Sequence, residues 1–374
     1  MMMGTAPLVF VPGLGFRPRD AKMLREPVTY KADGWDVTID SVIADRDGTH
    51  VAVTIYGPFK VTGDEFRRPE LDYNGLIQAR DRSGIVSSVG PRMFPMSHSF
   101  SGRGWSIACT ANMDALTAGD HQIDILINEP LPITIIPVTL RPIADLSIPA
   151  RPLEVSDEHH GVVVGAEAIA RGADMTAVLL HAKLRPHPRQ RFMRGLGTVR
   201  DGPRETPGVS IADEAGNEVV PFAATRELSP GPELRTIVVC PGLPTEAREV
   251  TITVPYVTVA EYTGSPLTLA IPSEGDITLG DDLAFVKVTR SDAPRGGKAV
   301  SVEFTGAWRG DRRLLFAESL TVGPKYGGVG FRGPPGEPPI ATWAEDPTGD
   351  SATVTLESPN IQLRGPWRLP ATLP

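Results

Sequence analysis

A stretch near the start of the chain is repeated 127 positions later without a gap, and this repeat restricts the fold more than any other feature. The first copy spans residues 34–53 and the second spans residues 161–180. With this offset, Gly34, Val37, Asp47, Thr49 and Val51 fall on Gly161, Val164, Asp174, Thr176 and Val178. Both copies alternate apolar and polar residues, which is the period of a half-buried strand and not of a helix. Repetition on this scale indicates that one supersecondary unit was copied along the chain.

Turn signals between the alternating segments predict hairpins in both copies. Asp47-Gly48 lies between two such segments, and an Asp-Gly pair in this setting is a strong hairpin signal. An aspartate followed three positions later by a glycine occurs twice in order, at 81–84 and at 213–216. We interpret this second correspondence as the turn of another hairpin in each copy.

The content of glycine and proline argues against long helices. The chain has 38 Gly and 37 Pro among its 374 residues, and both residues disfavour helix interiors. Short strands separated by turn signals about every ten residues are typical of β-sandwiches. We therefore predict an all-β protein made of tandem immunoglobulin-like β-sandwich domains.

The repeat and the prolines between its copies divide the chain into four parts. Residues 1–26 are predicted to form an N-terminal extension, and residues 27–143 the first sandwich. A connector containing several prolines precedes the second sandwich, residues 154–262, which repeats the first. Residues 263–374 are predicted to form a third and more diverged sandwich.

Charge and hydropathy exclude several classes of function. Lys and Arg number 37 and Asp and Glu 45, so the net charge is −8, which predicts that nucleic acid is not a partner. No apolar run reaches about 18 residues, the length that a membrane-spanning helix needs. The N-terminus lacks the pattern of a signal peptide. A signal or membrane anchor encoded before Met1 stays open as an alternative.

The two cysteines, Cys109 and Cys240, are too few for a disulfide framework. Each follows a similar apolar run and precedes a loop and then an alternating segment. We predict that they are small core residues at near-equivalent positions in two different copies.

The chemical motifs do not indicate catalysis, and we predict a protein that is not an enzyme and needs no cofactor or metal. The Gly-x-Ser-x-Gly pattern of α/β hydrolases is absent from the sequence. His159 and His160 beside Asp157 and Glu158 are a conceivable surface metal site, but zinc ligands usually come as two separated pairs. Because Asp33 aligns with His160 in the repeat, we favour a solvent-facing turn there.

Residues 183–204, called the basic loop below, are the candidate binding site. This stretch contains seven cationic residues and one acidic residue, Asp201, together with several prolines and glycines. Such a patch on an acidic molecule favours an anionic partner, such as lipid headgroups or a wall polymer. Its cations are Lys183, Arg185, Arg189, Arg191, Arg194, Arg200 and Arg204. The alternatives are a solvated loop tip, or a loop that folds onto a neighbouring unit through Phe192, Met193 and Leu196.

One part of the sequence resembles a known family. The residues concerned are Val11-Pro12-Gly13-Leu14-Gly15, Gly34, Val37-Thr38-Ile39-Asp40-Ser41-Val42, Asp47, Thr49 and Val51. They resemble the extracytoplasmic region of bacterial membrane proteins of the anti-sigma-factor type, a domain of unknown function. The likeness is clearest over residues 8–60 and recurs at 153–182. It implies an exported, non-catalytic sensor or scaffold ectodomain, although the chain has neither the preceding membrane span nor the cytoplasmic sigma-binding helices of that family.

Two hypotheses of function follow. The first is a bacterial extracytoplasmic protein, on the cell surface or secreted, that binds or spaces a cell-envelope component or a partner protein through the basic loop. The alternative is a carbohydrate-binding accessory protein of a polysaccharide-active system, in which aromatic side chains form a platform. Coplanar exposed indoles would favour sugar binding, and buried indoles would favour a scaffold. The tryptophans concerned are Trp105, Trp308, Trp343 and Trp367.

Overall fold

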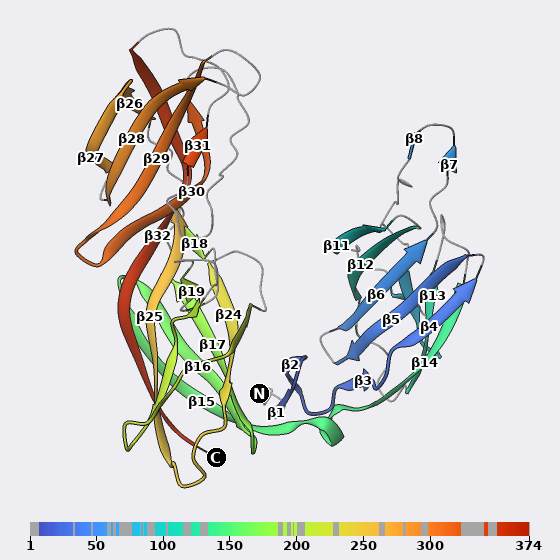
Figure 1. Cartoon of the computed structure of the whole chain (residues 1–374). Helices are drawn as coiled ribbons and strands as arrows, with labels where there is room; N and C mark the ends of the chain where they lie inside the picture. Colours follow the sequence, from blue (N-terminus) through green and yellow to red (C-terminus); the bar gives the residue numbers. More distant parts are fainter. Residues whose placement is uncertain are drawn as a thin grey trace. The chain divides into compact units, whose positions relative to one another are not determined.

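The computed structural model is almost entirely β, so the all-β prediction is confirmed (Figure 1). The described residues are 7–32, 34–45, 48–57, 61–62, 65–66, 77–82, 84, 86–87, 94–101, 104–113, 115, 121–127, 134–185, 190–192, 196, 198–199, 206–226, 232–261, 266–279, 282–292, 298–322, 340–342 and 350–373. Within them, no helix is long and apolar enough to cross a membrane, and a 3-10 turn, Ile143–Leu146, is the helix found. The chain divides into two compact units, residues 1–148 and 149–374.

The first unit is built around one antiparallel sheet. Its strands are β3 (Lys22–Leu24), β4 (Val28–Ala32), β5 (Trp35–Ala44), β6 (Thr49–Gly57), β9 (Ile77–Arg80), β10 (Val86–Ser87), β11 (Phe94–Ser101), β12 (Gly104–Met113), β13 (Gln122–Ile127) and β14 (Thr134–Pro142). Their order is β10-β9-β13-β14-β3-β5-β6-β12-β11, with β4 beside β5. Two small hairpins, β1 (Leu8–Val11) with β2 (Gly15–Pro18) and β7 (Val61–Thr62) with β8 (Glu65–Phe66), complete the unit.

The core of the first unit follows from the alternation in its sequence. Val51, Val53 and Ile55 of β6 are buried, and the residues between them are more exposed. They share one hydrophobic cluster with buried residues of β9, β13 and β14, such as Ile125. The two ends of the sheet therefore pack face to face across this cluster.

The described part of the second unit contains two large sheets and one two-stranded sheet. The first has the order β15-β16-β17-β24-β23, from β15 (Ile148–His159), β16 (Val162–Arg171), β17 (Met175–Leu184), β24 (Glu233–Pro241) and β23 (Ala223–Arg226). The second has the order β22-β21-β25-β32-β30-β29-β28-β27, from β22 (Glu218–Val219), β21 (Ser210–Asp213), β25 (Glu249–Glu261), β32 (Ser351–Thr372), β30 (Arg312–Val322), β29 (Lys298–Arg309), β28 (Asp282–Asp292) and β27 (Ser273–Leu279). Three shorter strands join the second sheet: β18 (Gln190–Phe192) pairs with β25, β26 (Pro266–Ala270) with β32 and β31 (Ile340–Thr342) with β29. Strands β19 (Thr198–Val199) and β20 (Thr206–Pro207) pair with each other as the two-stranded sheet.

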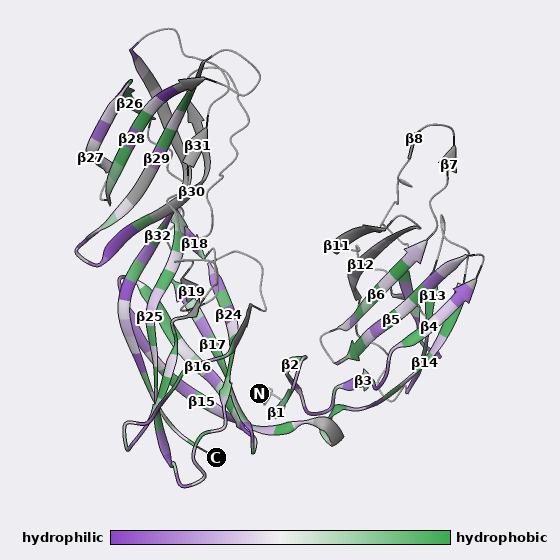
Figure 2. Cartoon of the chain, viewed as in Figure 1, coloured by the Kyte–Doolittle hydropathy of each residue, from purple (hydrophilic) through white to green (hydrophobic). Residues whose placement is uncertain are grey.

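The core of the second unit is continuous. Buried residues from both sheets belong to one hydrophobic cluster, which includes Val164 on β16, Ile252 on β25 and Val286 on β28. Figure 2 shows hydrophobic residues recurring along β16, β25, β28 and β29, between hydrophilic ones. The period-2 pattern of the sequence is thus the pattern of burial.

The two units pair their strands in the same register at a constant offset of 127. In the first unit Ile39 lies opposite Val53, and in the second Ala166 lies opposite Leu180. The next pair is displaced by a bulge in both cases, after Ile39 and after Ala166. The same offset relates the pairing of β4 with β5 to that of β15 with β16, and the pairing of β6 with β12 to that of β17 with β24.

The second turn correspondence also has one geometry in both units. Gly84 and Gly216 have φ values of 80 and 84, the left-handed region that glycine enters without strain. Their amides donate to the carbonyls of Asp81 and Asp213 at 3.1 and 3.0 Å. The carboxylate of Asp213 also accepts bonds from the backbone amides of Ala215 and Asn217, which explains the aspartate at this turn.

The second unit differs from the first by a long insertion. In the first unit β13 and β14 follow each other closely and pair Ile127 with Thr134. The corresponding pair in the second unit is Val254 with Trp367. The residues between them, 255–366, include strands β26 to β31, which are called the inserted block below.

Strand β32 belongs to two parts of the second unit. Residues 351–363 pair with β26 and β30 of the inserted block, whereas residues 360–372 pair with β25. The sequence pattern placed all of residues 263–374 in a third sandwich. The register instead returns the end of the chain to the repeated part, because β32 is long enough to pass from one pairing to the other (Figure 1).

The register also corrects the expected equivalence of the cysteines. Cys240 pairs with Thr176, and the matching pair in the first unit is Met113 with Thr49. The prediction was wrong because the two cysteines lie 131 positions apart instead of 127. Cys240 is a buried core residue, and burial raises the pKa of its thiol to about 11.

Candidate functional site

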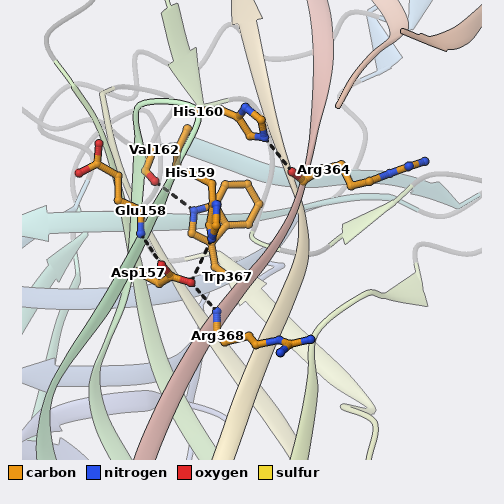
Figure 3. A network of polar contacts seen from close by, with 8 residues as sticks. All are labelled: Asp157, Glu158, His159, His160, Val162, Arg364, Trp367 and Arg368. Atoms are coloured by element: carbon orange, nitrogen blue, oxygen red, sulfur yellow. Dashed lines mark hydrogen bonds and ion pairs between the residues drawn. The ribbon is translucent and has the colours of Figure 1, made fainter. Parts of the chain in front are cut away.

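A network of polar contacts joins the turn between β15 and β16 to strand β32 (Figure 3). His159 lies opposite Val162, so His160 and Gly161 form a two-residue hairpin turn. Their φ values are 54 and 72, and the favoured two-residue turn requires positive φ at both positions. The turn expected at His160 is therefore present, and the glycine in the repeat is explained by it.

His160 contacts both β32 and the turn between β29 and β30. Its Nε2 lies 3.1 Å from the carbonyl oxygen of Arg364 and 3.8 Å from Oδ2 of Asp311. The amide of Arg364 donates to the carbonyl of Asp311 at 2.9 Å. These contacts lie where the inserted block meets the repeated part of the second unit.

Asp157 holds β15 to β32 through its carboxylate. Its Oδ1 accepts the amide of Glu158 at 2.8 Å, and its Oδ2 accepts the amide of Arg368 at 2.9 Å. Nε2 of His159 lies 3.2 Å from the same Oδ2. Burial raises the pKa of Asp157, but these hydrogen bonds outweigh it and hold the pKa below its ordinary value. The carboxylate is thus an ionised structural anchor at neutral pH.

Trp367 lies in the core beneath this network. Its side chain is fully buried, and Nε1 donates to the carbonyl of Val162 at 3.0 Å. Its ring meets that of His159 edge-on, with centroids 5.6 Å apart. One of the four tryptophans considered for a sugar platform is therefore a core residue.

Trp308 on β29 is half-buried and lies among polar and aromatic neighbours. Its ring stacks on that of Tyr256, with centroids 5.9 Å apart and an interplanar angle of 29°. The guanidinium carbon of Arg364 lies 4.1 Å from the Trp308 centroid, a cation–π contact. The side chains of Trp105 and Trp343 lie outside the described residues.

A second polar cluster lies on β16, β17 and β24. Glu167 is the extra residue of the bulge on β16, and Arg235 binds both of its carboxylate oxygens at 3.1 Å. Nδ1 of His181 lies 3.5 Å from the same carboxylate. In the first unit the bulge residue is Asp40, which accepts a bond from Thr54 at 2.7 Å. The acid at each bulge is therefore bound by side chains of other strands, Asp40 by Thr54 on β6 and Glu167 by His181 on β17 and Arg235 on β24, which is a structural role.

Replacing His181 with threonine, the residue of the first unit at this position, should reduce the pH dependence of stability. Burial lowers the pKa of His181, with Lys183 and Arg235 acting in the same direction against Glu167. The unfolded chain then binds the proton more readily, so the contribution of His181 is complete above the unfolded pKa and is lost as pH falls. Urea unfolding at about pH 7.5 and about pH 5.5, either side of the ordinary value of about 6.5, measures the difference. Equal differences in the wild type and the variant would contradict this prediction.

The structure describes three of the seven cations of the basic loop. Lys183 lies 3.2 Å from Glu233 and Arg185 lies 2.7 Å from Glu158, so both carry acidic partners. Arg191 is half-buried on β18, which pairs with β25. Arg189, Arg194, Arg200 and Arg204 lie outside the described residues.

The apolar residues of the basic loop are partly described. Phe192 and Leu196 are buried in the core of the second unit, and Met193 lies outside the described residues. This stretch of the loop therefore packs against the unit, as one of the alternatives from the sequence expected. In the described part of the chain, no group of three or more His, Cys, Asp or Glu residues has a geometry that could hold a metal.

Comparisons with known proteins add little to this description. No protein-family model matches the sequence, and a comparison with curated proteins finds no match. A crystal structure of a conserved domain protein from Bacillus anthracis is similar to this chain over 65% of its length and 80% of the other chain. The sequence identity is 13% and the TM-score is 0.30, and no function is transferred from this likeness.

Proposed function

We propose that this protein is a non-catalytic binding or scaffold protein of the bacterial cell exterior, built from tandem immunoglobulin-like β-sandwich domains. The observation that supports this proposal is the repetition of one strand pairing, with its bulge, in both units. A repeated β unit spaces surfaces along a chain and leaves the outward side chains free to differ between copies. The resemblance of residues 8–60 to ectodomains of the anti-sigma-factor type supports the extracytoplasmic location.

The proposed partner is an anionic cell-envelope component or a protein, and the proposed contact is the basic loop. Because Lys183 and Arg185 already carry acidic partners, the contact depends on the other cations of the loop. Arg191 is half-buried and is a poor choice for mutation, since a charge reversal there would disturb the fold. Arg189, Arg194 and Arg200 are therefore the residues to change.

Retention of the full chain on cell-envelope fractions tests this proposal. The variant in which Arg189, Arg194 and Arg200 are all changed to Glu should be retained about tenfold less than the wild type, because a basic patch concentrates anionic ligands. The control changes the exposed Arg19, Arg25 and Arg141 of the first unit to Glu, an equal change of net charge. Equal retention of the two variants would reject the loop as the contact, and no retention of the wild type would reject the binding function.

The contacts of Trp308 favour the second candidate function, a carbohydrate-binding accessory protein of a polysaccharide-active system. An indole stacked on a tyrosine beside an exposed arginine resembles the aromatic and polar lining of ligand sites. The burial of Trp367 removes one member of the expected platform. Of the two candidate tryptophans whose side chains the structure describes, Trp308 is therefore the one that still fits a sugar platform.

A further inference from the structure

One outward-facing row of residues in the second unit differs at every position from the matching row in the first unit. Ser156 on β15 lies opposite Gly165 on β16, and Gly165 lies opposite His181 on β17. Residues directly opposite each other in an antiparallel sheet project from the same face. The first unit has the same pairing at the offset of 127, with Thr29, Thr38 and Thr54 in the row. One scaffold therefore carries two different sets of functional groups.

Gly165 lets the imidazole of His181 lie directly on β16. A Cβ atom at position 165 would be 2.8 Å from Nε2 of His181 and still closer to Cε1, so only glycine leaves room for the ring in this place. Ser156 lies on the other side of Gly165 from His181. The glycine thus brings the Nε2 edge of the imidazole over the strand that separates it from the serine.

The other edge of the imidazole faces an acid. Nδ1 of His181 lies 3.5 Å from Oε1 of Glu167, and Arg235 binds both oxygens of that carboxylate at 3.1 Å. An acid at Nδ1 orients a histidine so that Nε2 can take the proton of a serine. Ser156 is exposed, and the side chain of His181 is 21% exposed, so a reagent from solvent can reach both. Serine, histidine and acid are called the serine site below.

The surroundings of His181 favour the neutral imidazole, the form that accepts a proton. Burial is the largest cause of its lowered pKa, and the charges of Lys183 and Arg235 act in the same direction, against Glu167 and Glu233. The charged groups of the neighbouring strands on this face are Glu158 on β15, Glu167 on β16, Lys183 on β17, and Arg235 and Glu233 on β24. Activation of a serine requires such a base, neutral at neutral pH.

We propose that Ser156 is an acylation site, with His181 as its base and Glu167 as the residue that positions the base. Oγ of Ser156 bonds to the carbonyl carbon of an ester or thioester, and its proton passes to Nε2 of His181. The bond from that carbon to the alcohol or thiol breaks, and the leaving group takes the proton from His181. The product is an O-acyl serine beside an unchanged histidine. This inference goes beyond the proposed binding function and does not depend on it.

The serine site lies on a sheet face, which limits it to modification. The backbone amides of β15 and β16 lie in the plane of the sheet, where they bond to neighbouring strands. Rapid turnover in hydrolases needs donors that point at the developing oxyanion. We therefore expect one slow acylation per chain and not catalysis.

Acetylation of the full chain by p-nitrophenyl acetate tests the inference, with the modified residue identified by peptide mass spectrometry. Ser156 should be acetylated in the wild type, and Thr29 of the first unit, which has threonines as neighbours, should not. The His181→Asn variant should acetylate Ser156 about a hundredfold more slowly, the contribution expected of a general base. Equal rates in the wild type and His181→Asn, or no acetyl group on Ser156 of the wild type, would overturn the inference.

Two further variants separate the chemistry from stability. The acetylation rate should rise with pH through the pKa of His181, and Glu167 raises that pKa. Glu167→Gln should therefore move the rising limb to lower pH and slow the reaction about tenfold, whereas an unmoved limb would reject Glu167 as the positioning residue. The double variant Gly165→Thr with His181→Thr copies the row of the first unit, so it should fold and leave Ser156 unmodified. Acetylation of Ser156 at the wild-type rate in this variant would also overturn the inference.

Discussion

Replacing Trp367 with alanine should lower the free energy of unfolding of the second unit by about 3–5 kcal/mol. The indole is fully buried, and its Nε1 donates to the carbonyl of Val162 at 3.0 Å. Its loss leaves a cavity at the end of β32 and an unpaired buried carbonyl on β16. Guanidinium unfolding followed by circular dichroism measures the change, and the loss should appear as a lower midpoint with an unchanged slope.

Two variants serve as controls for Trp367→Ala. Trp367→Phe keeps an aromatic ring but loses the N–H, so the carbonyl of Val162 loses its donor at a cost of about 1 kcal/mol in addition to the lost volume. Trp308→Ala removes an indole of the same size that is only half-buried, so it should cost less. If the alanine variants at 367 and 308 were equally stable, Trp367 would not be the residue that holds β32 to the core.

Replacing the inserted block with a tight turn should leave the repeated part of the second unit folded. Strands β25 and β32 pair with Ala260 opposite Asn360, which brings Glu261 and Pro359 side by side. An Asn-Gly pair in place of residues 262–358 then closes the two strands with the turn that hairpins favour. This change removes a large part of the chain while keeping the register of β25 on β32.

The repeated part should stay folded because it keeps the buried residues of both of its sheets, such as Val164 on β16 and Ile252 on β25. Thr258, Asn360 and Gln362 lie on one face of the paired strands. Ile361 and Leu363 on the other face share the hydrophobic core with Val286 and Leu314 of the inserted block, which the variant loses. We expect cooperative thermal unfolding with a midpoint within about 10 °C of the wild type, equivalent to a few kcal/mol for a unit of this size. Aggregation or non-cooperative unfolding would show that the inserted block is an integral part of the core.

A matched control for this variant shifts the register. Joining Ala260 directly to Pro359 by the same Asn-Gly turn slips one strand by one residue. A slip of one residue turns every side chain of a strand to the opposite face. This control should therefore fail to fold, and a stable control would mean that the turn and not the register decides folding.

Much of the local structure could be predicted from the sequence, because its causes lie within a few residues. The alternation in residues 34–53 and 161–180 predicts strands, and β5, β6, β16 and β17 lie there. Gly161 and Gly216 lie in turns with positive φ that few other residues adopt. Asp213 binds backbone amides of its own turn. Each of these features depends on contacts between residues that are close in the chain.

The return of β32 to the repeated part was missed, although a signal for it exists. Pro137-Val138-Thr139-Leu140 at the end of the first copy corresponds to Pro370-Ala371-Thr372-Leu373 at the end of the chain. The amides of Leu140 and Leu373 make equivalent bonds, at 2.7 and 2.8 Å, to His121 and Arg248. The match covers only four residues, and its offset differs from the 127 positions that relate the rest of the repeat.

The candidate site was the least predictable part. The sequence singles out the basic loop by its charge, but the acids that bind its first two cations, Glu158 and Glu233, come from other strands. Ser156 and His181 are ordinary polar residues in the sequence and become notable only because the register places Gly165 between them. Charge and residue type are visible in a sequence, whereas partners across strands are not.

By itself, the sequence determined the all-β class, the hairpin turns and the offset that relates the two copies, since alternation and turn chemistry act over a few neighbouring residues. Only the tertiary structure decided that residues 360–372 pair with β25 and that Trp367 is a core residue. These results depend on hydrogen bonds between strands that lie far apart in the chain. Such pairings are chosen by the burial of whole sheet faces, and not by any short stretch of residues.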